Sequence, residues 1–364
     1  MVSHVAVPAK LVSEAQVDGF ERVRFWGDVP PPNFERVLRE IARQRGGRLP
    51  REQQFLAISG GGSDGAFGAG LLVGWSARGT RPEFEAVTGV STGALIAPFA
   101  FLGPKYDKQL RDIYTRHSTE DLLIPMVLAG LLGGSAVTDA TPFENLLAKY
   151  ITPRILTAVA NEHRRGRRLL IGTTNLDAQR PVVWDMGAIA ASGRPDALYL
   201  FRRVLQASAS IPGVFPPVRI QVNADGRRYD ELHVDGGTTA QVFFLPSRIM
   251  LGRAELRMGF RAERTVYVIR NGRIRPQYKP IAPSVTEIAK RSLTTLINSQ
   301  ANSELKLLSE ASEKDSADFK LAYIPTDFDA VSNEAFDRSY MTKLFQVARR
   351  MAQRGYPWKD APPD

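Results

Sequence analysis

Short apolar runs alternate with longer stretches of helical spacing along most of the chain. The runs predict β-strands and the stretches predict α-helices. The strands are expected at 55–58, 84–90, 169–173, 182–184, 218–222, 227–234, 265–269 and 319–324. The helices are expected at 33–45, 66–75, 94–101, 105–117, 142–150 (with Thr141 as its N-cap), 155–163, 197–209, 285–310 and 333–353. Strands that alternate with helices indicate a mainly parallel sheet covered on both faces.

The same pattern suggests how the chain is organised. Residues 1–50 form an N-terminal arm, interrupted by three prolines at 30–32. Residues 51–245 form the core, and residues 246–364 supply further helices and strands that pack on the same domain. No internal repeat or low-complexity linker separates these parts, which favours one α/β unit.

A glycine-rich loop follows the first predicted core strand. The sequence Ser59-Gly60-Gly61-Gly62-Ser63-Asp64-Gly65 separates that strand from an apolar helix. A strand, a glycine loop and a helix in this order aim backbone N–H groups at negative charge. The loop also fits G-x-G-x-x-G, with Glu83 and Glu85 about 20 residues later where a dinucleotide site has its ribose-binding acid. A dinucleotide-binding protein is therefore one alternative.

The next strand-to-helix turn carries Gly-x-Ser-x-Gly, formed by Gly89, Ser91 and Gly93. This sequence is typical of a nucleophile elbow, which exposes a serine hydroxyl at a tight turn. Glycines flank the serine because the backbone is strained and neighbouring Cβ atoms would clash. A serine hydroxyl needs a general base to become a nucleophile. The motif thus predicts acyl-transfer chemistry and a histidine or carboxylate close by.

Asp235-Gly236-Gly237 supplies a third motif far downstream. The glycine loop, Gly-x-Ser-x-Gly and Asp-Gly-Gly, together with stretches 172–177 and 207–217, resemble the patatin-like phospholipase family, including bacterial members, over residues 55–237. The resemblance implies a three-layer α/β/α fold with a mainly parallel sheet. It also implies a lipid acyl hydrolase of the phospholipase A or lysophospholipase type, which uses Ser91 and Asp235 as a dyad and no cofactor.

In this resemblance the oxyanion hole is assigned to the loop residues Gly60, Gly61, Gly62, Ser63 and Gly65. Asp64 departs from the family pattern, which usually has Lys or Arg at that position. Burial of Asp235 among apolar strands is expected to raise its pKa toward the working pH. A triad remains an alternative. Glu231, His233 and Asp235 are spaced two residues apart, so on an extended strand their side chains would point to the same face.

Composition narrows the chemistry further. The chain has no cysteine, which excludes disulfides, thiolate metal sites and cysteine catalysis. No cluster of His, Asp and Glu has the spacing of metal ligands, so no catalytic calcium is expected. The net charge of +10 suits either plain solubility or an anionic lipid surface, and no nucleic-acid-binding motif accompanies it.

The apolar stretch 122–132 predicts either a buried helix or a docking surface at a lipid interface. It is shorter than the ~18 residues that span a bilayer. The first thirteen residues contain no apolar stretch of a signal peptide, so neither a signal nor a transmembrane segment is predicted. Similarity near 25–28 to bacterial lipoproteins of the family keeps an association with the cell envelope open. A phospholipid or other acyl lipid is the expected substrate, and a broader carboxylesterase is the runner-up.

Overall fold

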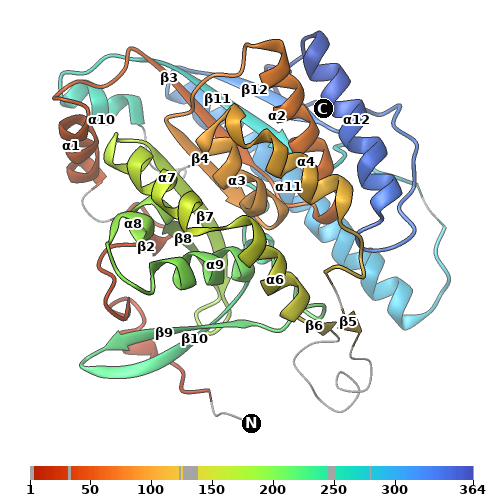
Figure 1. Cartoon of the computed structure of the whole chain (residues 1–364), viewed down its shortest axis with the longest axis horizontal. Coiled ribbons are helices and arrows are strands. Elements are labelled where there is room, and N and C mark those ends of the chain that lie inside the picture. Colours follow the sequence, from red (N-terminus) through yellow and green to blue (C-terminus); the bar gives the residue numbers. More distant parts are fainter. Residues whose placement is uncertain are drawn as a thin grey trace.

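The computed structural model describes residues 4–31, 34–122, 124–125, 138–244, 251–278 and 280–363. Figure 1 shows a central sheet with helices on both of its faces. This arrangement confirms the predicted three-layer α/β/α fold with a mainly parallel central sheet. None of the helices in the described ranges combines the length and apolarity needed to cross a bilayer.

Ten strands of the described chain form the main sheet. Eight of them follow one another across it in the order β1 (Gln16–Val17), β9 (Val218–Ala224), β10 (Arg227–Asp235), β7 (Arg168–Asn175), β4 (Ala86–Val90), β3 (Glu52–Ile58), β11 (Glu263–Arg270), β12 (Ala317–Tyr323). The five strands from β7 to β12 are parallel to one another, and β9 and β10 form an antiparallel hairpin. The remaining two are β8 (Arg180–Asp185) and β2 (Arg24–Trp26), and a separate small pair consists of β5 (Ile124–Pro125) and β6 (Thr138–Asp139).

Helices cover the two faces of the sheet through two separate apolar clusters. The larger cluster is formed with α2 (Gly65–Arg78), α3 (Thr92–Leu102), α4 (Asp107–Arg116), α6 (Thr141–Tyr150), α7 (Pro153–Arg164), α8 (Met186–Ala191), α9 (Ala197–Ser208) and α12 (Arg338–Arg354). The smaller cluster is formed with α1 (Phe34–Gln44), α10 (Leu251–Arg257) and α11 (Val285–Lys314). Strand β3 serves both clusters, because Leu56 and Ile58 point to one face and Phe55 and Ala57 to the other.

Strand β7 aligns the ends of two other strands. Strand β8 occupies one edge of β7. On the other edge, β4 runs parallel to β7 and ends with Val90 opposite Gly172. Strand β10 approaches antiparallel along that edge and ends with Asp235 opposite Thr173. The carboxyl ends of β4 and β10 therefore meet head to head along one strand.

All of the larger predicted elements are present, with differences at their ends. Helix α6 begins at Thr141 itself, so the prediction of Thr141 as its cap is wrong; the side chain of Asp139 accepts hydrogen bonds from Thr141 instead. Helix α12 begins at Arg338, later than predicted. Strands β1 and β2 from the first fifty residues pair with the sheet, and α8 and α10 have no counterpart in the predictions. Most of the apolar stretch 122–132 lies outside the described residues.

Candidate active site

Ser91 occupies the tight turn between β4 and α3, where its backbone has φ +55° and ψ −125°. A Cβ at Gly89 would lie 2.5 Å from the carbonyl oxygen of Gly93. A Cβ at Gly93 would lie 2.3 Å from the carbonyl oxygen of Ile58. Both glycines are therefore required by close backbone contacts, and the positive φ of Ser91 is held by the surrounding structure. The geometry is that of the predicted elbow.

Ser91 and Asp235 are in direct contact at the meeting point of β4 and β10. The Ser91 hydroxyl donates to Oδ2 of Asp235 over 2.6 Å. The other carboxylate oxygen, Oδ1, accepts the backbone N–H of Gly237 at 2.7 Å. The two residues are almost buried, with 7% and 6% of their surfaces exposed. One oxygen of the carboxylate is thus anchored while the other faces the hydroxyl.

Burial dominates the electrostatics of Asp235. Desolvation raises the pKa of Asp235 to about 6, although the hydrogen bonds from Ser91 and from the Gly237 N–H both favour the ionised form. At neutral pH the carboxylate is still largely ionised. It is also a stronger base than an ordinary aspartate, because the pKa of its conjugate acid is higher.

The glycine loop packs directly against the elbow. A Cβ at Gly60 would lie 3.2 Å from the Cβ of Ser91. The N–H of Gly60 donates to the carbonyl of Gln241, and the N–H of Gly65 donates back to Gly62 and Ser63. Within the described ranges, no protein acceptor is hydrogen-bonded to the N–H of Gly61 or Gly62.

Ser63 follows Gly62 in a short 3-10 turn, Gly62–Asp64, that leads into α2. The candidate oxyanion donors of the loop therefore reduce to the N–H groups of Gly61, Gly62 and Ser63, because those of Gly60 and Gly65 already have acceptors in the protein. Gly61 also carries a steric constraint. Its φ is +155°, and a Cβ there would lie only 2.0 Å from the carbonyl oxygen of Asn271.

A buried arginine from β11 supports the same loop. Arg270 is 2% exposed, and its Nη1 lies 3.3 Å from both the hydroxyl of Ser59 and the carbonyl oxygen of Gly60. Asn271 adds two bonds to Ser59: its backbone N–H donates to the hydroxyl at 2.8 Å, and its side-chain amide donates to the carbonyl at 2.9 Å. No sequence motif predicted these two residues, although the Arg-Asn-Gly sequence at the end of an apolar strand is a signal that could have indicated them.

Asp64, the residue that departs from the family pattern, is half-buried at the end of the 3-10 turn that leads into α2. Burial raises the pKa of Asp64, while the hydroxyl of Tyr340, which donates to it at 2.5 Å, and the positive charge of Arg270 act in the opposite direction. The cation near the loop is thus supplied by β11 rather than by the loop itself.

His233 belongs to a different network. Its Nε2 lies 3.0 Å from Oε2 of Glu231, and its Nδ1 lies 2.9 Å from the hydroxyl of Thr173. Glu231 in turn forms a buried ion pair with Arg24. Both ring nitrogens are therefore engaged away from Ser91, and His233 is fully buried. The structure brings Glu231 and His233 together, as their parity suggested, but not with Ser91.

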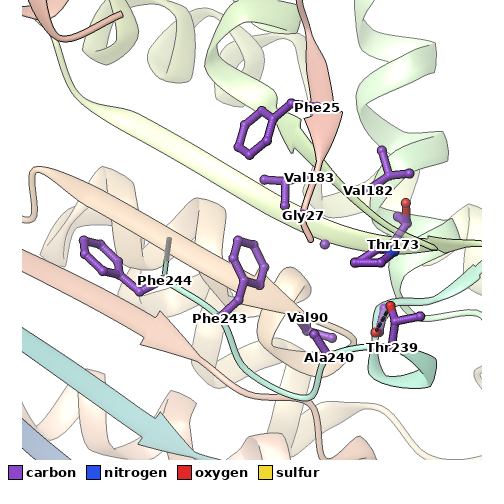
Figure 2. A pocket seen from close by; sticks show the side chains of 13 residues that line it. Phe25, Gly27, Val90, Thr173, Val182, Val183, Thr239, Ala240, Phe243 and Phe244 are labelled. Carbon is purple, nitrogen blue, oxygen red and sulfur yellow. Dashed lines mark hydrogen bonds between the residues drawn. The ribbon is translucent and has the colours of Figure 1, made fainter. Parts of the chain in front are cut away.

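An apolar cavity of about 50 Å³ opens beside Ser91. Its lining comes from α3, α4, α6 and the segment after α9, and includes Leu95, Phe143, Ala209, Ile211 and Phe215. A second apolar cavity, of about 60 Å³, lies between β2, β8 and the segment that follows Asp235 (Figure 2). Phe25, Val183 and Phe243 face this second cavity, and neither Ser91 nor Asp235 lines it.

The acids of the dinucleotide alternative lie at the wrong edge of the sheet. Glu83 and Glu85 precede β4, at the amino end of the parallel strands, whereas the glycine loop follows the carboxyl end of β3. Glu85 forms an ion pair with Arg45. Neither acid can reach a ribose bound at the loop. In the described part of the chain, no group of three or more His, Asp or Glu residues is arranged to hold a metal ion.

The fold and the site define an α/β protein in which a serine and an aspartate meet at two strand ends beside a glycine loop. The family model of patatin-like phospholipases matches residues 56–246, just over half of the chain. The chain therefore belongs to the patatin-like phospholipase family. No curated protein matches it in sequence.

Solved structures that are similar to the chain include three of low sequence identity. VipD from Legionella pneumophila has 12% sequence identity and a TM-score of 0.36, and the match covers 85% of this chain and 68% of that chain. Human GIVD cytosolic phospholipase A2 has 10% identity and a TM-score of 0.40, with 92% of this chain and 64% of that chain covered. The complex of SpcU with ExoU from the type III secretion system of Pseudomonas aeruginosa has 15% identity and a TM-score of 0.33, with 84% of this chain and 52% of that chain covered. The chain thus spans about half to two thirds of the length of these proteins.

Proposed function

We propose that this protein hydrolyses carboxylic ester bonds of acyl lipids, with Ser91 as the nucleophile and Asp235 as the general base. The observation that carries the proposal is the 2.6 Å hydrogen bond from the Ser91 hydroxyl to Asp235 at a strained strand-to-helix turn. Family membership supports a lipid-ester substrate. The same pair of residues gives the reaction its first proton transfer.

In the first half of the reaction, Oγ of Ser91 attacks the carbonyl carbon of the ester while its proton passes to Oδ2 of Asp235. The carbonyl oxygen becomes an oxyanion, which the N–H groups of Gly61 and Gly62 stabilise. Loss of one such donor typically costs about 3 kcal/mol of transition-state stabilisation. The tetrahedral intermediate then expels the alcohol, which takes its proton from Asp235, and leaves an acyl ester on Ser91.

In the second half, Asp235 accepts a proton from a water molecule that attacks the acyl ester. A second tetrahedral intermediate forms on the same oxyanion donors. Its collapse releases the fatty acid and returns the proton from Asp235 to Oγ of Ser91. Each half therefore begins and ends with Asp235 ionised, and one carboxylate serves as base and then as acid.

The apolar cavity beside Ser91 supports an acyl chain as the group that binds there. Apart from Thr92, its lining residues from α3, α4 and α6 are aliphatic or aromatic, and burial of each methylene contributes roughly 0.8 kcal/mol. Among the described residues that line it, only Ser91, Thr92 and Tyr114 carry side-chain polar atoms. Tyr114 bonds to Thr92. Orientation of the substrate is thus left to the serine and the glycine loop.

The test uses a fluorophosphonate probe and a series of p-nitrophenyl esters of increasing chain length, assayed beside phospholipid vesicles. The wild-type protein should be labelled once, and Ser91→Ala should lose both labelling and hydrolysis. Retained labelling in Ser91→Ala would contradict the assignment of the nucleophile. A preference for short esters with no action on phospholipid would instead favour the broader carboxylesterase.

A further inference from the structure

Helix α11 has two halves with different surroundings. From Asn298 onward it is anchored beside the site: Oδ1 of Asn298 lies 3.2 Å from Nη2 of Arg270, and the side-chain amide of Gln300 donates to the carbonyl of Thr239 at 2.8 Å. Arg270 supports the glycine loop, and Thr239 follows the Asp-Gly-Gly motif. This half of α11 is therefore fixed against both loops that form the candidate site.

The half before Asn298 lies beyond the carboxyl edge of the sheet. Helix α11 connects the parallel strands β11 and β12, so it starts at their carboxyl side and returns to their amino side. Figure 1 shows its first turns projecting at the lower right of the view. Thirteen residues of the helix, 285–297, precede Asn298, and they correspond to roughly 20 Å of helix.

Large apolar side chains face water along this projecting half. Val285, Ile288, Leu293 and Leu296 are 86%, 48%, 52% and 68% exposed. At 100° per residue these four positions fall on one side of the helix, opposite Glu287. A contiguous exposed apolar face of this kind marks an interaction surface.

The sequence around this face is basic, which favours an anionic partner. Between residues 273 and 297 the sequence has five basic residues and one acidic residue. Tyr278, in the segment that leads into the helix, is 94% exposed, and Arg275 beside it is also exposed. Apolar side chains on one face of a helix with basic residues around them are typical of a helix that lies in an anionic membrane interface.

We propose that residues 285–297 of α11 form a docking surface for an anionic lipid bilayer. The inference deepens the proposed function, on which it rests, because it names the surface at which the ester substrate is met. Insertion of Leu293 and Leu296 into the lipid would bring the Asn298 end of the anchored half, and with it the glycine loop, to the membrane.

The experiment measures co-sedimentation with vesicles in a Ser91→Ala background, so that no lipid is consumed. Vesicles of equimolar phosphatidylglycerol and phosphatidylcholine are compared with pure phosphatidylcholine. Leu296→Asp should weaken binding to the anionic vesicles on the order of tenfold, because a leucine that would insert into the lipid is replaced by a negative charge. The matched control is Leu307→Asp, which is 56% exposed on the same side of the same helix, roughly 16 Å further along.

Leu307→Asp should bind as the parent protein does, and both variants should melt at the parent temperature because both side chains are exposed. Equal binding by all three proteins would overturn the proposal, as would equal losses in the two variants. Analytical ultracentrifugation provides the other decisive outcome: if Leu296→Asp dissociates a dimer and vesicle binding is unchanged, the face belongs to a second copy. Absence of ester hydrolysis with intact Ser91 would defeat the proposed function while leaving the binding result valid.

Discussion

Replacing Asp235 with asparagine separates the effect of this residue on ester hydrolysis from its effect on the free energy of unfolding. The change keeps the shape of the side chain, and an asparagine oxygen can still accept the N–H of Gly237. The proposed base is lost, however, and the amide nitrogen now faces the Ser91 hydroxyl. Ester hydrolysis is therefore expected to fall by a factor on the order of 10³ or more. In the wild-type protein, activity should fall as the pH drops through about 6, because protonation of Asp235 removes the base.

The same substitution should make the protein more stable at alkaline pH. The pKa of Asp235 is raised from 3.8 in the unfolded chain to about 6 in the fold, so the folded state binds its proton more tightly. Stability is lost as the pH rises between these values. A difference of about 2 units corresponds to roughly 3 kcal/mol once the pH is well above 6. Asparagine does not ionise and avoids this loss, although a poorer contact with Ser91 reduces the gain.

Urea unfolding of the wild type and Asp235→Asn at pH 8 and at pH 4.5 measures this difference. The variant should be the more stable protein at pH 8, and its advantage should shrink at pH 4.5. His233→Gln serves as the matched control from the same strand: it should keep most of the activity and lose stability, because His233 joins Glu231 and Thr173 in a buried network. Equal stability of Asp235→Asn and wild type at both pH values would refute the linkage argument, and substantial residual activity would refute the assignment of the base.

Two further substitutions test how the glycine loop is held. Gly61→Ala should lower the rate of hydrolysis about 10²-fold or more, since its Cβ would lie 2.0 Å from the carbonyl of Asn271 and would displace an oxyanion donor; Gly79→Ala, at φ +80° with open space around it, should cost about 1 kcal/mol of stability and no activity. Arg270→Gln should reduce kcat about tenfold with little change in KM, because Arg270 contacts the loop and not the acyl cavity; unchanged kcat in a folded variant would show that Arg270 only stabilises the sheet.

Much of the fold was predictable because local patterns determine it. The apolar runs at β3, β4, β7 and β11 have the length and flanking glycines of buried parallel strands, and each was expected within a few residues. The elbow glycines were predictable for the same reason, since the clashes that they avoid involve their own turn and the adjacent strand. Short elements such as α8 and β2 were missed, because six or three residues carry too little periodicity.

Contacts between distant segments account for what the sequence did not reveal. Arg270 supports the glycine loop only because β11 pairs with β3, and no local pattern specifies that order. Glu231 became the partner of Arg24 because the first fifty residues join the sheet through β2. Parity correctly placed His233 beside Glu231, yet it could not show that Thr173 on β7 would occupy the other ring nitrogen.

The meeting of two strand ends along β7 gives a physical reason why the proposed dyad needs no third residue. In a serine–histidine pair a third group must orient the imidazole. A carboxylate has two oxygens, and here the N–H of Gly237 fixes Oδ1 while Oδ2 receives the Ser91 hydroxyl. Both partners also end strands that share the same neighbour, with Val90 opposite Gly172 and Asp235 opposite Thr173. The backbone of the sheet thus performs the orienting role that a third side chain has in a triad.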